Sequence, residues 1–185
     1  MPNKIAKFEK VSYEQFEKDY LEIAVKFNKT VNDEPSLSTD PEEIRRIYDS
    51  IVLPKRATVS SAGYDFFAPF DFKIPANRKS IVIPTGIRCH MEDDGWMLAL
   101  FPRSGLGFKY RVALDNTVGI IDADYYNAEN EGHIMIKLHS DTNLVVDIRE
   151  KQGISQGILI PYGITIDDTT TEKRVGGIGS TDKKE

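Results

Sequence analysis

The spacing of apolar residues changes near residue 50 of this 185-residue chain. Ahead of that point apolar positions recur every three or four residues, which is the period of an amphipathic helix. Ser12 and Gln15 have the spacing of a capping box, and this favours a helix start there. The apolar stripe of the helix that follows is expected to consist of Phe16, Tyr20, Ile23 and Phe27.

A second helix is expected after a polar, proline-containing break at 32–39. Asp40 is a good N-cap, Pro41 fits the first helical position, and Glu43 places an acid in the first turn. The apolar stripe of this helix consists of Ile44, Ile47, Tyr48 and Ile51. The pattern predicts an N-terminal helical extension over residues 1–50. Its two short helices look like an appendage, and nothing in them suggests chemistry.

From about Leu53 onward the pattern is typical of strands. Short β-rich runs alternate with Pro and Gly: FDFKIP, SIVIPTGIRCHM, WMLALFP, HIMIKLH, NLVVDI and QGILIPYGITI. Many short strands separated by turns predict an all-β sandwich or barrel over residues 51–166. The Thr-, Gly- and Lys-rich tail, residues 167–185, is expected to be a flexible arm. Within 133–139, Ile134, Ile136 and Leu138 fall on one face, and His133, Met135, Lys137 and His139 fall on the other, polar one.

Composition and charge remove several classes of function. The chain has 24 Lys and Arg against 29 Asp and Glu, a net charge of −5, which argues against general nucleic-acid binding. The single cysteine, Cys89, excludes an intrachain disulfide framework and a cysteine-based zinc cluster. No apolar run is long enough to span a membrane, and the amino terminus has no apolar signal-peptide region. A cytoplasmic protein is expected.

Common catalytic signatures are missing or out of context. The sequence has no P-loop, no HExxH and no EF-hand pattern, and its three histidines lack metal-ligand spacing. GISQG at 153–157 matches the nucleophile elbow, but a strand-like ILIPYGI follows it where that motif needs a helix. A set of loops rich in Gly, Ser, Asp and Arg remains. Taken singly, each is explained as well by an ordinary polar turn.

The order and spacing of these loops change the interpretation. LPKRATVSSAGYDFFAP, PRSGLGFKY, LDNTVGIIDADYY, ISQGILIP and RVGGIGSTD closely resemble the five motifs of the trimeric dUTP pyrophosphatase (dUTPase) family, from about Ile51 to Asp182. The resemblance implies a jelly-roll-like β-sandwich that forms a homotrimer, with each active site built from more than one subunit and closed by the carboxyl-terminal arm. It also implies Mg²⁺-assisted hydrolysis of dUTP to dUMP and pyrophosphate, which removes dUTP from the nucleotide pool and supplies dUMP for dTMP synthesis.

The resemblance carries individual roles to this chain. Asp122 matches the catalytic acid that deprotonates the water attacking the α-phosphorus. Tyr125 matches the tyrosine packed beneath the deoxyribose, where it leaves no room for a 2′-hydroxyl. A ring in that place selects dUTP over UTP by exclusion. The hairpin that receives uracil is matched by Asn116, Gly119, Ile120 and Ile121, with Met135 on the return strand.

Other matches surround the phosphates. A guanidinium, a hydroxyl and backbone N–H groups suit anionic oxygens; the residues that match this role are Arg103, Ser104, Gly105 and Gln156. Asp65 matches an acid that supports the architecture around the metal and the arm. The arm itself matches at Arg174, Ile178, Gly179, Ser180 and Thr181. The resemblance implies that substrate oxygens and water hold Mg²⁺, with no direct protein ligand.

The sequence departs from the family pattern in several places. Ile178 stands where the family usually has a phenylalanine that stacks on uracil, and Gly153 stands where an arginine is common. The arm is one residue short, and Asp182 replaces a usual glycine. Residues 126–131, called the insert below, make the uracil hairpin longer than usual. The tip of the hairpin is expected to be exposed.

Two other functions remain open on the sequence. A dCTP deaminase shares the fold, but that family needs a glutamate just after the aspartate-containing hairpin, where DADYYN supplies Asp and Tyr. A regulatory member of the fold would use the N-terminal helices or the long hairpin to bind a protein partner. Retention of Ser104, Asp122 and Tyr125 favours the enzyme.

Overall fold

The computed structural model describes residues 4–30, 37–172, 174, 176 and 177. Within these ranges the helices are α1 (Tyr13–Thr30), α2 (Pro41–Ser50), α3 (Ser104–Tyr110) and the 3₁₀ helix η1 (Ala123–Asn127). The strands are β1 (Ala6–Lys10), β2 (Lys55–Arg56), β3 (Tyr64–Phe67), β4 (Phe72–Ile74), β5 (Ser80–Pro84), β6 (Ile87–Met91), β7 (Trp96–Pro102), β8 (Val112–Leu114), β9 (Gly119–Asp122), β10 (Met135–Ser140), β11 (Val146–Ile148) and β12 (Gly153–Pro161).

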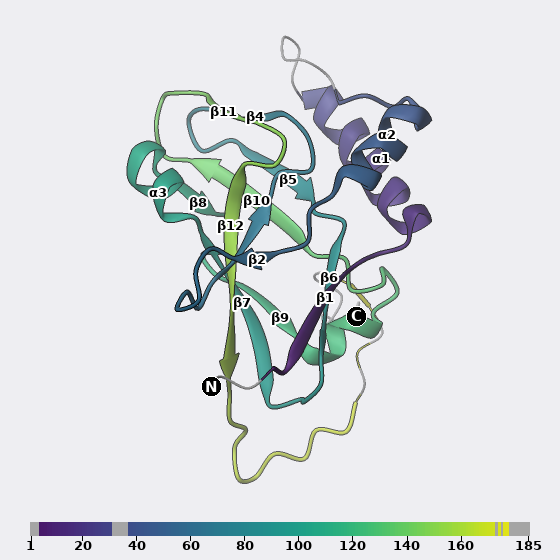
Figure 1. Ribbon diagram of the computed structural model, residues 1–185, viewed down its shortest axis with the longest axis vertical. Helices are drawn as coiled ribbons and strands as arrows, with labels where there is room; N and C mark the ends of the chain where they lie inside the picture. Colours follow the sequence, from purple (N-terminus) through teal and green to yellow (C-terminus); the bar gives the residue numbers. More distant parts are fainter. Residues whose placement is uncertain (1–3, 31–36, 173, 175, 178–185) are drawn as a thin grey trace, which may run out of the picture.

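The strands form antiparallel sheets that face one another across a shared core. One sheet has the order β2-β3-β12-β7-β9 and another the order β5-β10-β8, and the pairs β1-β6 and β4-β11 extend the structure (Figure 1). Phe66 and Leu98 from the first sheet and Ile83 and Leu138 from the second are almost completely buried. The predicted all-β, jelly-roll-like sandwich is confirmed, and its alternating inward residues follow the two-residue period of strands.

Both predicted N-terminal helices are present. The side chain of Asp40 accepts a hydrogen bond from the Glu42 N–H (3.0 Å), and the Ser12 hydroxyl accepts one from the Gln15 N–H (3.1 Å). These bonds satisfy backbone donors that a helix start leaves unpaired. Phe16 and Ile44 of the two stripes are fully buried, whereas Ile23, Phe27 and Tyr48 are partly buried against the same core.

The helices are not an appendage, because their apolar side chains belong to the same core as the strands. Tyr20 of α1 packs edge-on against Phe70, with ring centroids 5.4 Å apart. The extension also contributes β1, which the sequence pattern did not predict and which pairs with β6 over five residues, from Ala6 opposite Met91 to Lys10 opposite Ile87. Figure 1 shows α1 and α2 over one end of the sandwich, with β1 running down its side.

The predicted hairpin between 116–122 and Met135 is wrong at the level of strand pairing. Within the described residues β9 pairs with β7, whereas β10 pairs with β5 and β8. The long connection through η1 and the insert carries the chain from one sheet to the other. Gly132 ends this connection at φ +68, and a Cβ there would lie 2.7 Å from the Tyr125 carbonyl oxygen, so the close return of the chain needs glycine.

Two further expectations about this region need correction. The insert is exposed only in part: Asn127 and Glu129 are exposed, but Ala128 is buried and Tyr126 and Glu131 are half-buried against the extension. His133 and His139 are buried as well, although alternation placed them on a polar face. Each histidine has a carboxylate partner at 2.6 Å, Asp19 for His133 and Asp115 for His139, which explains why a polar ring is stable there.

Candidate active site

The residues matched to phosphate binding gather where β7 ends. Arg103 precedes α3 in an extended conformation, and its carbonyl accepts hydrogen bonds from the Leu106 and Gly107 N–H groups (both 3.0 Å). Ser104 and Gly105 occupy the exposed first turn, where backbone N–H groups lack partners within the helix. An open cavity of about 520 Å³ lies beside Arg103 and Ser104. This surface suits an anionic ligand.

Neighbouring strands hold the Arg103 side chain in place. Its guanidinium lies 3.2 Å from the Asp65 carboxylate of β3. Asp65 is opposite Gln156 of β12, whose amide donates to the Pro102 carbonyl oxygen at 3.4 Å. A Cβ at Gly153 would lie only 2.1 Å from the Arg103 Nη1. A side chain at this position would therefore displace the flexible end of Arg103 from its present place, and glycine leaves room for the guanidinium.

A second group of residues surrounds Asp122 at the end of β9. The Asp122 side chain is 49% exposed. The turn of η1 places Tyr125, which is only 3% exposed, beside it. Arg174 reaches both residues: its Nη1 donates to Asp122 Oδ2 at 3.3 Å, and its guanidinium carbon lies 5.3 Å from the centre of the Tyr125 ring. Arg174 also donates to Asp124 at 3.4 Å. A carboxylate, an aromatic ring and a cation thus share one surface.

The Tyr125 hydroxyl both donates and accepts a hydrogen bond. The hydroxyl donates to the His133 carbonyl oxygen (2.8 Å) and accepts from the Asn130 side-chain amide (2.8 Å). Burial raises the pKa of Tyr125 against the opposing effects of Asn130 and the Arg174 charge. The ring is therefore neutral at physiological pH and has a single orientation. The sequence motifs had not indicated Asn130 or His133 as part of this site.

The residues matched to uracil binding lie along the entry to β9. Asn116 is exposed in a tight turn in which Thr117 has φ +64. The Asn116 carbonyl oxygen accepts a hydrogen bond from the Val118 N–H at 2.6 Å. Gly119 packs against Leu100, where a Cβ would meet the leucine side chain at 3.2 Å. Ile120 is half-exposed and Ile121 is buried. Met135 is half-buried in the other sheet, where it pairs with Pro84 of β5.

The two groups lie apart within one chain. On β7, Met97 is opposite Asp122 and Pro102 is opposite Ser155, so Asp122 and Arg103 are separated by six residues of strand. At about 3.3 Å per residue this is roughly 20 Å. Hydrogen bonds to a phosphate need heavy-atom distances near 3 Å. One phosphate group therefore does not bridge Asp122 and Arg103 of the same copy.

The remaining candidate residues from the sequence motifs add no reactive group to the site among the described residues. Ile178, Gly179, Ser180 and Thr181 lie outside the described residues. Ser155 of the GISQG match is buried in β12 and donates to the Phe101 carbonyl oxygen (2.7 Å), so it is no exposed nucleophile. The part of the chain that the structure describes contains no group of three or more His, Cys, Asp or Glu side chains that could hold a metal ion. None of its helices is long and apolar enough to cross a membrane.

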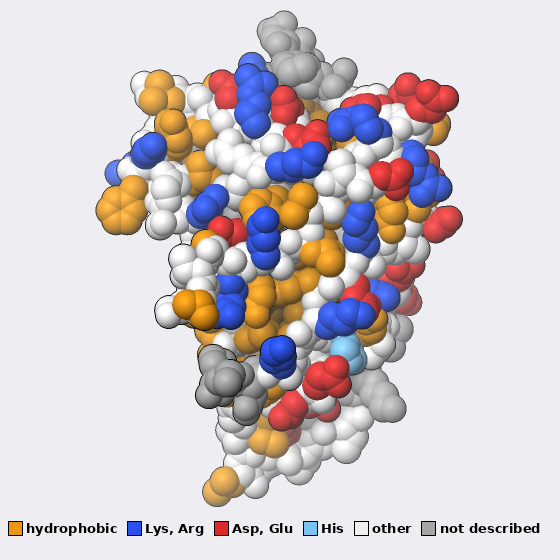
Figure 2. Space-filling view, in the orientation of Figure 1, with side chains coloured by type: hydrophobic (Ala, Val, Ile, Leu, Met, Phe, Trp, Pro, Cys, Tyr) orange, Lys and Arg blue, Asp and Glu red, His pale blue; other side chains and the backbone are white. Residues whose placement is uncertain are grey.

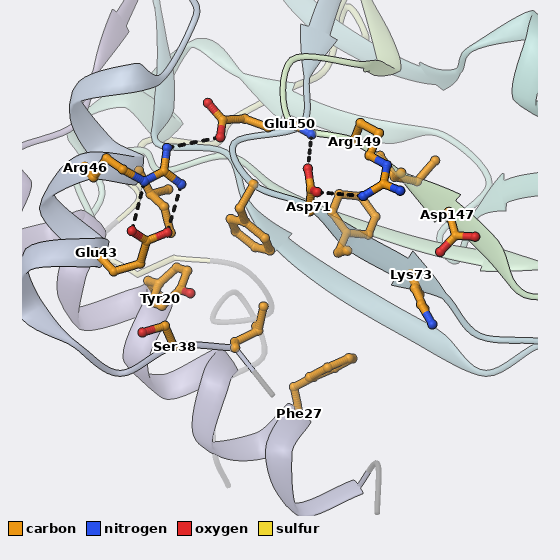
Figure 3. Close-up of a pocket in the computed structure, with 15 residues that line it drawn as sticks. Tyr20, Phe27, Ser38, Glu43, Arg46, Asp71, Lys73, Asp147, Arg149 and Glu150 are labelled. Atoms are coloured by element: carbon orange, nitrogen blue, oxygen red, sulfur yellow. Dashed lines mark hydrogen bonds and ion pairs between the residues drawn. The ribbon is translucent and has the colours of Figure 1, made fainter. Parts of the chain in front are cut away.

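A partly open cavity of similar volume lies elsewhere. It has a volume of about 540 Å³ and separates the N-terminal helices from β4 and β11 (Figure 3). Several of its charged residues are paired with one another, since Arg46 bonds to Glu43 (2.8 Å) and Glu150 (3.2 Å) and Arg149 bonds to Asp71 (2.9 Å). None of the matched site residues lines it. The chemistry of the two groups above is a better guide to the site than cavity size.

Comparison with known proteins agrees with this architecture. The dUTPase family model matches residues 49–182. The deoxyuridine 5'-triphosphate nucleotidohydrolase of Lactococcus lactis is 38% identical over 141 residues, which cover 71% of this chain and 88% of the relative. The crystal structure of the dUTPase from Streptococcus mutans superposes with a TM-score of 0.57 at 36% identity, covering 63% of this chain and 90% of that one.

A more distant solved structure shares the fold at 19% identity. It is a variant dUTPase from phage phi11 of S. aureus, described for its coordination of a structural Mg(II) ion, with a TM-score of 0.55 over 67% of this chain and 92% of that one. The fold and the family match together define the class: this chain belongs to the dUTPase family. The family match begins at residue 49 and leaves out α1 and nearly all of α2.

Proposed function

We propose that this protein hydrolyses dUTP to dUMP and pyrophosphate. The observation that carries the proposal is the joint placement of Asp122, Tyr125 and Arg174 on one surface, at the positions that match the catalytic and substrate-binding residues of the family. The relatives named as deoxyuridine 5'-triphosphate nucleotidohydrolases support the same substrate. Removal of dUTP and supply of dUMP for dTMP synthesis would follow. The single, buried Cys89 suits a reducing cytoplasm.

Asp122 is proposed to act as the general base. Its half-exposed carboxylate can accept a proton from a water molecule in line with the α-phosphorus. The contact from Arg174 at 3.3 Å is long for a charge-assisted hydrogen bond. Substrate phosphates can therefore draw Arg174 away and leave Asp122 free for the water, while Arg174 and the rest of the arm hold the outer phosphates.

Tyr125 and the turn ahead of β9 are proposed to select the nucleoside. The buried, doubly hydrogen-bonded ring of Tyr125 is rigid, and a rigid ring beneath C2′ excludes a ribose hydroxyl. The backbone from Asn116 to Ile121 would recognise uracil, with Met135 limiting the space at its edge. Ile178 of the arm would cover the base.

Arg103, Ser104 and Gly105 are proposed to bind the triphosphate, with Gln156 nearby and Asp65 orienting the arginine at 3.2 Å. The proposed Mg²⁺ would be carried by the substrate phosphates and water. Mg²⁺ across the phosphates would offset their charge. In this arrangement Arg103 and Arg174 supply the cationic contacts that the protein itself makes.

We further propose that the working enzyme is a homotrimer, because the two groups are roughly 20 Å apart along β7 in one chain. Asp122 of one copy would meet Arg103 of another. Apolar side chains gather over the middle of the face in Figure 2, with Lys and Arg around them, and almost fully exposed Phe108 and Val59 add apolar surface that a second copy would cover.

Mixed assemblies test this arrangement. Asp122→Asn and Arg103→Ala chains should each be nearly inactive alone. Co-expression should restore dUTP hydrolysis, because a mixed trimer contains sites that combine the intact Asp122 of one copy with the intact Arg103 of another. If mixed assemblies are confirmed by tagged co-purification and remain as inactive as each parent, the shared site is wrong.

The position of attack tests the reaction itself. With dUTP and Mg²⁺ in ¹⁸O-labelled water, attack on the α-phosphorus places the label in dUMP, and mass spectrometry of the products detects it there. Label in the pyrophosphate instead would show attack on the β-phosphorus and remove Asp122 from its proposed position relative to the substrate.

A further inference from the structure

The N-terminal extension grips the insert through polar side chains. The Glu131 carboxylate accepts hydrogen bonds from the Ser12 N–H (2.7 Å) and the Ser12 hydroxyl (2.6 Å). The Tyr126 hydroxyl donates to Glu9 of β1 (2.7 Å), and Arg88 lies 4.4 Å from the Tyr126 ring centre and 3.2 Å from Glu9. Hydrogen bonds from Lys7 and Tyr126 lower the pKa of Glu9 to about 2. Burial opposes ionisation of Glu131, but the hydrogen bonds from Ser12 outweigh it and lower the pKa of that carboxyl. Both carboxylates are therefore ionised at neutral pH.

A second connection is buried. The Gly86 N–H donates to His133 Nε2 (2.7 Å), so the proton of the neutral ring is on Nδ1 and is donated to Asp19 of α1 (2.6 Å). Gln15 also donates to Asp19 (2.7 Å). Burial opposes ionisation of Asp19, but the bonds from His133 and Gln15 outweigh it and lower the pKa of that carboxyl below its usual range. His133 is thus fixed by a charged partner from the extension.

These two connections converge on Tyr125. The main-chain carbonyl of His133 accepts a hydrogen bond from the Tyr125 hydroxyl, and the side-chain amide of Asn130, next to Glu131, donates one to the Tyr125 hydroxyl oxygen. Both groups that orient the phenol therefore lie in the segment that Asp19 and Ser12 hold from the extension. Neither Asp19 nor Ser12 lies within the residues that match the family model.

We propose that the N-terminal extension orients Tyr125, with Asp19 acting through His133 and Ser12 acting through Glu131 as positioning residues that set the selectivity for dUTP over UTP. The proposal rests on the proposed function, because it takes Tyr125 as the residue that excludes the 2′-hydroxyl. It also gives the insert a role: the insert connects the sugar-binding tyrosine to the extension.

The test compares variants of the full-length protein on two substrates. Asp19→Ala removes the partner of His133. Asp19→Asn retains an acceptor for the Nδ1–H of His133 and should therefore keep part of the selectivity for dUTP over UTP. Glu131→Ala breaks the second connection at a half-exposed position and leaves the core intact. Glu22→Ala is the matched control, because Glu22 lies on the same helix and bonds to Lys26 on the exposed face.

The readouts are KM for dUTP and the ratio of kcat/KM for dUTP over UTP, measured beside the melting temperature. Both Asp19→Ala and Glu131→Ala should lower the ratio by about fivefold, the equivalent of one hydrogen bond, and raise KM for dUTP. Glu22→Ala should match the wild type. A merely structural role would lower the active fraction and the melting temperature without moving either KM or the ratio.

The outcomes separate the two proposals. An active wild type whose ratio and KM are unchanged by Glu131→Ala, and by Asp19→Ala where that chain folds, overturns the positioning role alone. A wild-type chain that folds and releases no pyrophosphate from dUTP overturns the proposed function, and the positioning role with it. A lower ratio of kcat/KM for dUTP over UTP in both Asp19→Ala and Glu131→Ala, with a smaller decrease in Asp19→Asn, supports the positioning role.

Discussion

Gly153→Ala provides a sharp test of the phosphate-binding group because it adds one carbon at a crowded point. The new Cβ would lie 2.1 Å from Arg103 Nη1, 2.8 Å from its Cζ and 3.0 Å from its Cδ. Contacts this short do not occur between non-bonded atoms, so the Arg103 side chain must move. Because these atoms belong to the flexible end of the side chain, the guanidinium is expected to shift, and this shift should disturb its contact with the Asp65 carboxylate and its alignment with a phosphate.

The expected cost is small for folding and large for catalysis. The Arg103–Asp65 pair spans 3.2 Å with the arginine 42% exposed, so its loss is worth at most about 1 kcal/mol. For a chain of this length that lowers the melting temperature by about 2–4 °C. A charge-assisted hydrogen bond to the substrate is worth about 1.5–3 kcal/mol. The value of kcat/KM for dUTP should therefore fall by about 10- to 150-fold.

Steady-state pyrophosphate release by the wild type, Gly153→Ala and a double variant with Arg103→Ala measures this effect. Gly163→Ala is the matched control, because a Cβ there meets nothing within 4 Å. If Gly153 matters through Arg103, Gly153→Ala should change little in the Arg103→Ala background. Wild-type kcat/KM in Gly153→Ala, or the same loss with Arg103 absent, would refute the reasoning.

Three further predictions address the other parts of the site. Asp122→Asn should lower kcat by about 10²- to 10⁴-fold while dUTP still binds, and near-normal kcat in stopped assays would remove Asp122 from the base role. Tyr125→Ala should raise kcat/KM for UTP relative to dUTP; an unchanged ratio contradicts the steric account. Since the pKa of Asp19 is lowered in the folded state, its stabilising contribution is present at neutral pH and is lost as the pH falls below about 4. The melting temperatures of the wild type and Asp19→Ala should therefore converge between pH 7 and pH 3, and a constant difference would contradict this.

The sequence was sufficient where local chemistry decides the structure. Asp40 and Pro41 mark the start of α2 because capping depends on near neighbours, and the β-rich runs after Leu53 became strands because alternation requires one buried face. The motifs named Arg103, Asp65, Asp122 and Arg174 as candidate residues, but the structure is what brings Arg103 beside Asp65 and Arg174 beside Asp122 in two separate groups. Their separation along β7 depends on strand register, which the motif order does not contain.

The failures came from contacts that are distant in sequence. Residues 6–10 have no strong strand pattern of their own and form β1 because β6 offers an open edge. His133 lies on the face that alternation makes polar, but it is buried because Asp19, 114 positions away, satisfies its ring. The insert contains polar residues typical of an exposed tip, and Glu9 and Ser12 hold it against the protein. Contacts between residues so far apart in the chain leave no recognisable pattern in the sequence around either residue.

Pyrophosphate release by the purified full-length protein with Mg²⁺, run in parallel on dUTP, dCTP, dTTP and UTP, tests the central claim most directly. The proposed site predicts rapid release from dUTP alone, because the turn at 116–121 accepts uracil and Tyr125 excludes a ribose. Ammonia release from dCTP would instead indicate a deaminase. A folded trimer inactive on all four nucleotides would contradict the enzymatic function and favour a protein-binding role for this fold.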